Sequence, residues 1–182
     1  EAPLPVAIIL EPGPRYRIGQ ILMLAEPARE DALLERAAAE LRLAEGDPAR
    51  PADILAAEEG LLRALRRAGH PLASIVARDA VVDHDTKTMD ITWRVAPGPP
   101  ANFGQPSVAG AARTDPQLLT RLATRRLEDQ PYSPERLERA RRALMGLGVF
   151  NFVRVTESPT LDEAWRLPVH FQVQERPRHA VG

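Results

Sequence analysis

The sequence contains no cysteine, so neither a disulfide nor a thiolate-ligated metal site can form. Its formal net charge is only −1, and without an excess of positive charge the chain as a whole is not drawn onto the phosphate backbone of a nucleic acid. No apolar run approaches the roughly 18 residues that a membrane-spanning helix needs. A composition of 44% hydrophobic and 27% charged residues is instead typical of an ordinary globular protein.

Motifs that carry catalysis are also missing. The chain has no Ser-His-acid pattern, no phosphate-cradling glycine loop and no HExxH motif. His84 stands between Asp83 and Asp85, but adjacent side chains on a strand point in opposite directions, and acidic tight turns between strands are common. The other histidines have no ligand-like spacing: His70, His170 and His179. We therefore expect no metal site, no cofactor and no enzymatic activity.

One phrase recurs three times along the chain. It reads LPVAIILEPGP at residues 4–14, MDITWRVAPGP at 89–99 and LPVHFQVQERP at 167–177. Large apolar residues occupy every second position in each copy, which is the pattern of a strand with one buried face. The copies begin about 80 residues apart, a spacing typical of compact domains in series. The pattern predicts an array of domains, and it predicts that the first copy closes a preceding domain.

The segments between the copies follow the same order twice. An apolar opening strand is expected at 16–24 and again at 101–109, followed by a helix, a proline-marked turn, a second helix and two closing strands. Because the closing strands alternate apolar with polar residues, the helices must cover one sheet face while water wets the other. The predicted fold class is α+β, with two units of β-α-α-β-β order, each having two helices packed on one face of a three-stranded mixed sheet.

Several residues mark the expected ends of these helices. Asp115 and Pro116 provide an N-cap and a first-turn proline for the first helix of the second unit. Gly69 and Gly148 stand where a left-handed C-cap is wanted, after the second helix of each unit. In the first unit, the apolar stripe of the first helix extends to Leu41.

The two units resemble POTRA domains, the periplasmic modules that precede the outer-membrane barrel in the BamA and TamA superfamily. The resembling residues are the opening segments with Gly19 and Gly104, the stretch QPYSPERLERARRALMGLGVFNFVRV at 130–155, and the closing strands that run into PGP. The second unit carries the most specific part of the resemblance, at 131–155. The first unit departs from it, with GHPLAS at 69–74 in place of GVFNFV.

The resemblance implies a domain organisation. Residues 1–13 would be the closing strand of a missing preceding POTRA domain, 14–98 one POTRA domain, and 99–177 the barrel-proximal POTRA domain. Residues 178–182 would begin the link to an outer-membrane β-barrel, because the third phrase continues as ERPRHAVG, which resembles the passage into a first barrel strand. The pair is most similar to the two barrel-proximal POTRA domains of a TamA-like protein.

The resemblance also implies a function. The chain would be the periplasmic portion of a Gram-negative outer-membrane protein assembly or translocation factor. It would bind unfolded outer-membrane protein or autotransporter clients by β-augmentation and feed them to its own barrel, with an inner-membrane protein or a lipoprotein as a further partner. The expected partner-binding residues lie on the edge strands: Ser74, Ile75, Val76, Phe150, Phe152, Arg154 and Thr156.

Two alternatives stay open at this stage. Within the superfamily, the transporter of a two-partner secretion system also carries paired POTRA domains. From another class, a nucleic-acid-binding α+β tandem of KH type would share the β-α-α-β order. This sequence has no GxxG loop and no basic face for that role, so we expect no nucleic-acid partner.

A stripe of arginines on the last helix has two interpretations. Arg136, Arg139 and Arg142 would face anionic lipid head groups if this helix lay near the membrane. However, Glu135 and Glu138 stand four residues ahead of Arg139 and Arg142, a spacing that forms ion pairs on a solvated helix face. The solvated face is the favoured interpretation.

Phe152 also has two interpretations. If its neighbours pack inward around a local irregularity, Phe152 projects from an edge strand beside unpaired backbone groups and is a candidate for docking a partner strand. The alternative is that Phe152 is simply part of the core.

Overall fold

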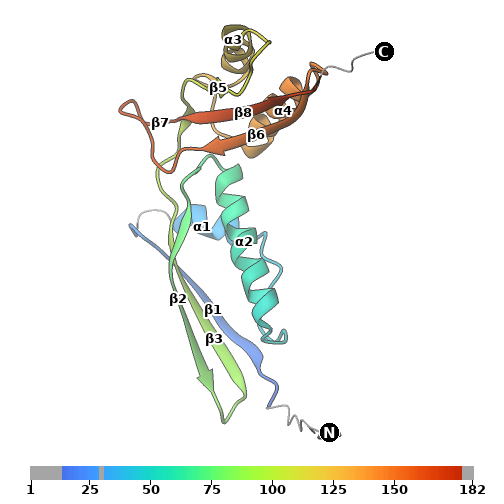
Figure 1. Cartoon of the computed structure of the whole chain (residues 1–182). Coiled ribbons are helices and arrows are strands. Elements are labelled where there is room, and N and C mark those ends of the chain that lie inside the picture. Colours follow the sequence, from blue (N-terminus) through green and yellow to red (C-terminus); the bar gives the residue numbers. More distant parts are fainter. Residues whose placement is uncertain (1–13, 29–30, 178–182) are drawn as a thin grey trace, which may run out of the picture.

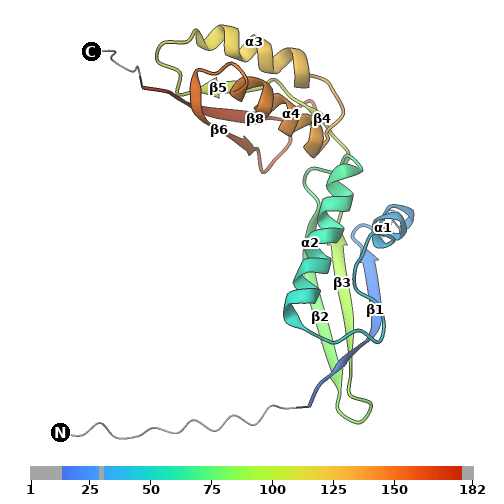
Figure 2. The ribbon, with the colours of Figure 1, turned by 90° about the vertical axis from the view of Figure 1, so that its right-hand side faces the viewer.

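The computed structural model describes residues 14–28 and 31–177, which form two units that lie end to end (Figure 1, Figure 2). The first unit contains β1 (Arg17–Ala25), α1 (Asp31–Ala38), α2 (Pro51–Arg67), β2 (Ser74–Asp83) and β3 (Thr88–Ala96). The second contains β4 (Asn102–Phe103), β5 (Ser107–Ala109), α3 (Pro116–Leu127), α4 (Pro134–Met145), β6 (Phe150–Glu157), β7 (Arg166–Leu167) and β8 (Val169–Glu175). The segments 1–13 and 178–182, expected to be a closing strand and a link to a barrel, lie outside the described residues.

The first unit is a three-stranded mixed sheet with its helices on one face (Figure 2). The strand order is β1-β3-β2, with β1 parallel and β2 antiparallel to the central β3. Ile91, Trp93 and Val95 alternate along β3 and are almost fully buried, in one cluster with Leu61 and Leu65 of α2. The alternation in the second copy of the repeated phrase therefore buries one face of a central strand, as predicted.

Gly19 allows β1 to approach β3 closely. The Gln20 backbone N–H donates a hydrogen bond to Asp90 Oδ1 at 2.8 Å, and a Cβ on residue 19 would collide with that same oxygen. The register between the two strands also shifts here, between Ile18 and Ile21. This place in the repeat requires glycine because any side chain would displace the carboxylate.

The second unit repeats the plan with divided strands. The opening strand expected at 101–109 is split into β4 and β5 around Gly104 and Pro106, and Pro168 separates β7 from β8. Proline has no N–H to give to a ladder, so it falls where pairing is interrupted. The sheet order is β5-β8-β6, with β5 parallel and β6 antiparallel to β8, and β4 pairs with β7. Its separate core is built on three fully buried phenylalanines, Phe103, Phe150 and Phe171. The expected fold class is confirmed in both units.

Two of the predicted helix ends are confirmed. Asp115 caps α3 by accepting a hydrogen bond from the Gln117 N–H at 2.8 Å. Gly69 follows α2 with φ +100°, a left-handed conformation that only glycine adopts without strain. Ser133, which was not singled out from the sequence, caps α4 by accepting from the Arg136 N–H at 3.3 Å.

Two other helix ends come earlier than predicted. Gly148 has φ +73°, but α4 has already ended at Met145, because the next turns are tighter and the Gly148 N–H donates to the Met145 carbonyl at 3.1 Å. In the first unit, α1 ends at Ala38, so Leu41 lies beyond it. There too the Leu41 N–H bonds only three residues back, to the Ala38 carbonyl at 2.9 Å.

A cluster of three polar side chains joins the two units. Arg66, in the last turn of α2, donates from Nε and Nη2 to the Tyr132 hydroxyl at 2.9 and 2.7 Å, and from Nη2 to Glu157 as well. The hydroxyl donates in turn to Glu157 Oε1 at 3.1 Å. Burial raises the pKa of Tyr132 to about 12, so the hydroxyl keeps its proton at neutral pH. Since Tyr132 precedes α4 and Glu157 ends β6, this cluster ties α2 to the edge of the second sheet.

Candidate strand-docking edge

β6 is an outer strand of the second sheet. In the order β5-β8-β6 it has β8 on one side, and among the described residues no strand pairs with its other side. An outer strand exposes one row of backbone N–H and C=O groups, which another extended segment can pair with. The residues that supply this row follow from the hydrogen bonds of the neighbouring strand.

Two hydrogen bonds fix the direction of the backbone groups in the closing strand. The Leu167 carbonyl accepts from the Gly104 N–H at 2.8 Å, on the side of the opening strand. The Pro168 carbonyl accepts from the Ser158 N–H at 2.9 Å, on the side of β6. Backbone groups of successive strand residues point alternately to the two neighbours. The even-numbered residues of β8 therefore bond to β6, and the odd-numbered residues face β5.

The register between the strands transfers this alternation to β6. Arg154 lies opposite Gln172, so its N–H and C=O are engaged with β8. The same holds for the two residues of equal parity, Phe152 and Thr156. The residues of opposite parity direct their backbone groups away from β8: Val153, Val155 and Glu157. These three form the outward row that a docking strand would pair with.

An open groove lies beside this row, between β6 and α4. Its volume is about 420 Å³. Helix α4 contributes Pro134, Leu137, Glu138 and Arg141, and β6 contributes Phe152, Val153, Arg154, Val155 and Glu157. The valines and Leu137 give the groove an apolar floor, whereas charged side chains line its rim. A strand added to β6 would point every second side chain into this groove.

The structure divides the residues expected on β6 into two kinds. Phe152 projects from the strand and is 39% exposed, because the register shifts between Phe150 and Phe152, and the guanidinium of Arg154 lies 5.3 Å from the centre of its ring. Phe150, by contrast, is fully buried in the core. The Phe150 side chain is therefore not available to a partner, and the expected role of this edge strand in partner binding stays a prediction.

Sequence reasoning missed Val153 and Val155, whose backbone groups point outward. It selected Phe152, Arg154 and Thr156, which would touch a docked strand through their side chains alone. Counting every second residue back from Ser158 would have identified the residues whose backbone groups face β8, and hence the alternate residues whose groups point outward, but this count requires knowing how β6 pairs with β8.

β2 is the corresponding outer strand of the first unit. The Val95 carbonyl accepts from the Glu26 N–H at 2.8 Å, on the side of β1, so the odd-numbered residues of β3 face away from β2. Arg78 and Ala80, which lie opposite odd-numbered residues of β3, therefore direct their backbone groups outward. The residues expected here lie at the start of the strand, where Ser74 and Val76 are exposed and Ile75 packs partly against the core.

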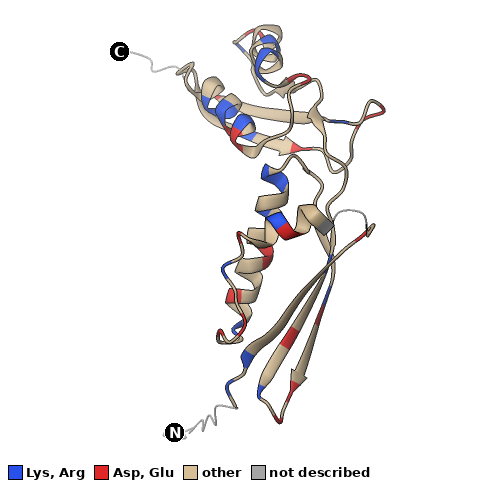
Figure 3. Cartoon of the chain, turned by 180° about the vertical axis from the view of Figure 1, so that it is seen from behind, with Lys and Arg blue, Asp and Glu red and all other residues tan. Residues whose placement is uncertain are grey.

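Basic and acidic residues both occur along α4 (Figure 3), and Arg141 and Arg142 pair with a carboxylate of the same helix. Glu138 pairs with Arg141 at 2.7 Å and, as expected, with Arg142 at 3.5 Å. The expected pair of Glu135 with Arg139 does not form among the described residues, because Glu135 instead accepts a hydrogen bond from the N-cap Ser133 hydroxyl at 2.6 Å. That hydrogen bond lowers the pKa of Glu135. The two ion pairs of Glu138 fit the solvated-face interpretation.

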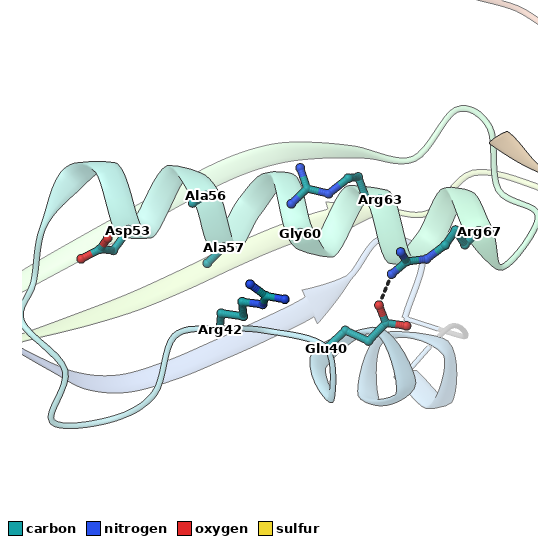
Figure 4. Close-up of a pocket in the computed structure, with 8 residues that line it drawn as sticks. All are labelled: Glu40, Arg42, Asp53, Ala56, Ala57, Gly60, Arg63 and Arg67. Atoms are coloured by element: carbon teal, nitrogen blue, oxygen red, sulfur yellow. Dashed lines mark hydrogen bonds and ion pairs between the residues drawn. The ribbon is translucent and has the colours of Figure 1, made fainter. Parts of the chain in front are cut away.

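A further hollow lies in the first unit, between α2 and the segment that follows α1 (Figure 4). It measures about 570 Å³ and is lined by Glu40, Arg42, Asp53, Ala56, Ala57, Gly60, Arg63 and Arg67. Arg67 is paired with Glu40 across it. Three arginines and two carboxylates give the hollow mixed charge, and the part of the chain that the structure describes has no group of three metal-ligating side chains.

None of the helices within residues 14–28 and 31–177 is long and apolar enough to cross a membrane.

Comparison with known proteins identifies the class of the second unit by sequence. Residues 101–176 match the family model of the POTRA domain, described as a surface antigen variable number repeat. A comparison with curated proteins by sequence found no match.

Solved structures extend the likeness to both units. BamA POTRA domains 3 to 5 from Haemophilus influenzae superpose with a TM-score of 0.69 at 23% identity, over 88% of this chain and 61% of that one. BamA from Haemophilus ducreyi lacking POTRA domains 1–3 gives 0.66 at 18%, over 88% of this chain and 30% of that one. POTRA domains 1 and 2 of Omp85 from Anabaena give 0.54 at 13%, over 91% and 99%.

The second unit thus matches the POTRA family in sequence, and the two units together have the fold of tandem POTRA domains. The predicted resemblance to POTRA domains is confirmed, by sequence for the second unit and by fold for both units. The chain spans less than two thirds of the Haemophilus chains it resembles. The narrower resemblance to a TamA-like protein stays a prediction.

Proposed function

We propose that this chain is the periplasmic POTRA region of an outer-membrane protein assembly or translocation factor of the TamA or BamA kind, and that β6 receives its client by strand addition. In this proposal residues 14–98 and 99–177 are successive POTRA domains. They act as a non-enzymatic scaffold that holds unfolded outer-membrane protein or autotransporter segments for a β-barrel, with an inner-membrane protein or a lipoprotein as a further partner.

The observation that carries the proposal is the outward backbone row of Val153, Val155 and Glu157 beside the apolar groove along α4. Main-chain hydrogen bonds bind an extended segment whatever its sequence, and a groove for alternate side chains adds modest selectivity. This combination suits clients that are unfolded β-strands, which differ in sequence but share alternating apolar residues.

A matched pair of substitutions at one position tests the proposal. Val155→Pro removes an outward N–H, whereas Val155→Ala keeps it and shortens the side chain. A short fluorescent peptide with apolar residues at every second position is titrated into the native chain and into each variant. We expect Val155→Pro to weaken binding about tenfold or more and Val155→Ala to change it by less than about threefold.

Circular dichroism should show that both variants remain folded. Equal affinities for the proline and alanine variants would mean that β6 is not the docking strand, and an absence of binding to the native chain would refute the proposal altogether.

A further inference from the structure

The two outer strands stand at equivalent places in the repeat, yet different helix side chains face them. The sequences of α2 and α4 can be aligned by their buried residues, which pairs Ile54 with Leu137, Ala57 with Ala140 and Leu61 with Leu144. This register aligns Glu58 of the first unit with Arg141 of the second. A carboxylate in one groove is thus replaced by a guanidinium in the other.

The strand residues of the two grooves differ as well. Arg78 of β2 lies opposite Trp93, and Val155 of β6 lies opposite Phe171. Trp93 and Phe171 are both fully buried and occupy the same position in the repeated phrase. Arg78 and Val155 are therefore equivalent, and both direct their backbone groups outward.

In the first unit a side-chain bridge crosses the groove. Arg78 Nη1 donates to Glu58 Oε1 at 2.9 Å, and the buried Trp93 indole donates to the same oxygen at 2.8 Å. Only 15% of the Glu58 side chain is exposed, so two donors hold the carboxylate in a partly desolvated place where charge-assisted hydrogen bonds are strong. The hollow beside the bridge measures about 230 Å³ and touches β2 only at Arg78 and Ala80.

The second groove is open along its length. Arg141 turns along its own helix, with Nε and Nη2 donating to Glu138 at 2.7 Å each, and Val155 supplies floor where Arg78 stands in the first unit. No ion pair among the described residues joins α4 to β6, and the groove follows β6 from Phe152 to Glu157.

We propose that the Glu58–Arg78 bridge is a specificity determinant that closes the β2 edge and restricts strand docking to β6; this inference rests on the proposed function. A strand added beside β2 would lie about 4.8 Å from it and would point alternate side chains toward α2. That space holds the Arg78 side chain and its bond to Glu58. A client would have to break the bridge and leave the carboxylate with one donor fewer, whereas at β6 it meets valines.

The test opens the first groove in a chain whose second edge is disabled. In a Val155→Pro background, Glu58→Gln with Arg78→Val removes the bridge, and the glutamine oxygen still accepts from the Trp93 indole. Titration uses the same fluorescent peptide with alternating apolar residues. We expect the opened chain to bind about tenfold or more tightly than Val155→Pro alone. Adding Ala80→Pro, which removes an outward N–H of β2, should abolish that gain.

A matched control breaks an ion pair on the other face of the same sheet. Asp79 and Arg94 pair at 3.4 Å with both side chains about half exposed, so Asp79→Asn with Arg94→Val should leave peptide binding as weak as in Val155→Pro. Arg78→Val alone, which keeps Glu58 bonded to the indole, should give a smaller gain and serves if the double variant does not fold.

The outcomes separate the inference from the proposed function. If the native chain binds through β6 and the opened chain gains nothing, the gating role of Glu58 and Arg78 is refuted while the β6 site stands. If Val155→Pro alone already binds in a way that Ala80→Pro abolishes, the β2 edge was never closed, and the inference is overturned. If the native chain binds no such peptide, both fall.

Discussion

A proline substitution should destabilise the fold more at Arg154 than at Val155, although the two residues are neighbours in β6. Arg154→Pro removes an N–H that is bonded to the Gln172 carbonyl and puts the proline ring against that oxygen. The lost hydrogen bond costs about 1 kcal/mol, and an unpaired carbonyl between strands adds about 1–3 kcal/mol, which gives about 2–4 kcal/mol in total. Val155→Pro removes an outward N–H that bonds to no strand, so we expect it to cost less than about 1 kcal/mol.

Thermal unfolding followed by circular dichroism measures this difference. For a domain of this size, each kcal/mol shifts Tm by about 4–8 °C, so Arg154→Pro should lower Tm by at least about 8 °C and Val155→Pro by less than about 8 °C. Arg154→Ala and Val155→Ala control for the loss of each side chain. Equal losses for the two proline variants, or a larger loss for Val155→Pro, would refute the assignment of the outward row.

Two further substitutions test the electrostatics of the second unit. The Thr114 N–H donates to Glu175 at 2.7 Å and is the main reason that the pKa of Glu175 falls to about 2. The ionised carboxylate therefore stabilises the fold at pH values above its unfolded pKa of about 4.3. This contribution is lost as the pH falls toward 2. The Tm advantage of the native chain over Glu175→Gln should accordingly be constant above about pH 5 and shrink on acidification; an advantage that does not change with pH would contradict this. Tyr132→Phe removes the hydroxyl that links Arg66 to Glu157 and should lower the free energy of unfolding by about 1–2 kcal/mol in urea titrations. An unchanged urea midpoint would mean that the cluster of Arg66, Tyr132 and Glu157 adds no stability.

The sequence predicted the features that depend on local pattern. Alternating apolar residues identified the central strands, in which Trp93 and Phe171 are buried, because a strand with one covered face imposes a period of two. The Asp115 cap and Gly19 could also be found, since capping and the close approach of β1 to Asp90 restrict residue type strongly.

Features that depend on pairing between distant segments could not be predicted. The parity of Val155 follows from its register with β8, and the register shift between Phe150 and Phe152 alters any count made along β6 alone. The cluster of Arg66, Tyr132 and Glu157 brings together side chains from two units, and nothing in the sequence around any one of these residues indicates the contact.

Amide hydrogen exchange measured by NMR, with and without saturating peptide, tests the strand-docking claim most directly. Without peptide, the Arg154 and Thr156 amides should be protected by β8, while Val153 and Val155 exchange faster. With peptide, we predict that Val153 and Val155 become protected and that Arg154 and Thr156 change little. If Val153 and Val155 still exchange at their original rates when the peptide is bound, the client does not dock by adding a strand to β6.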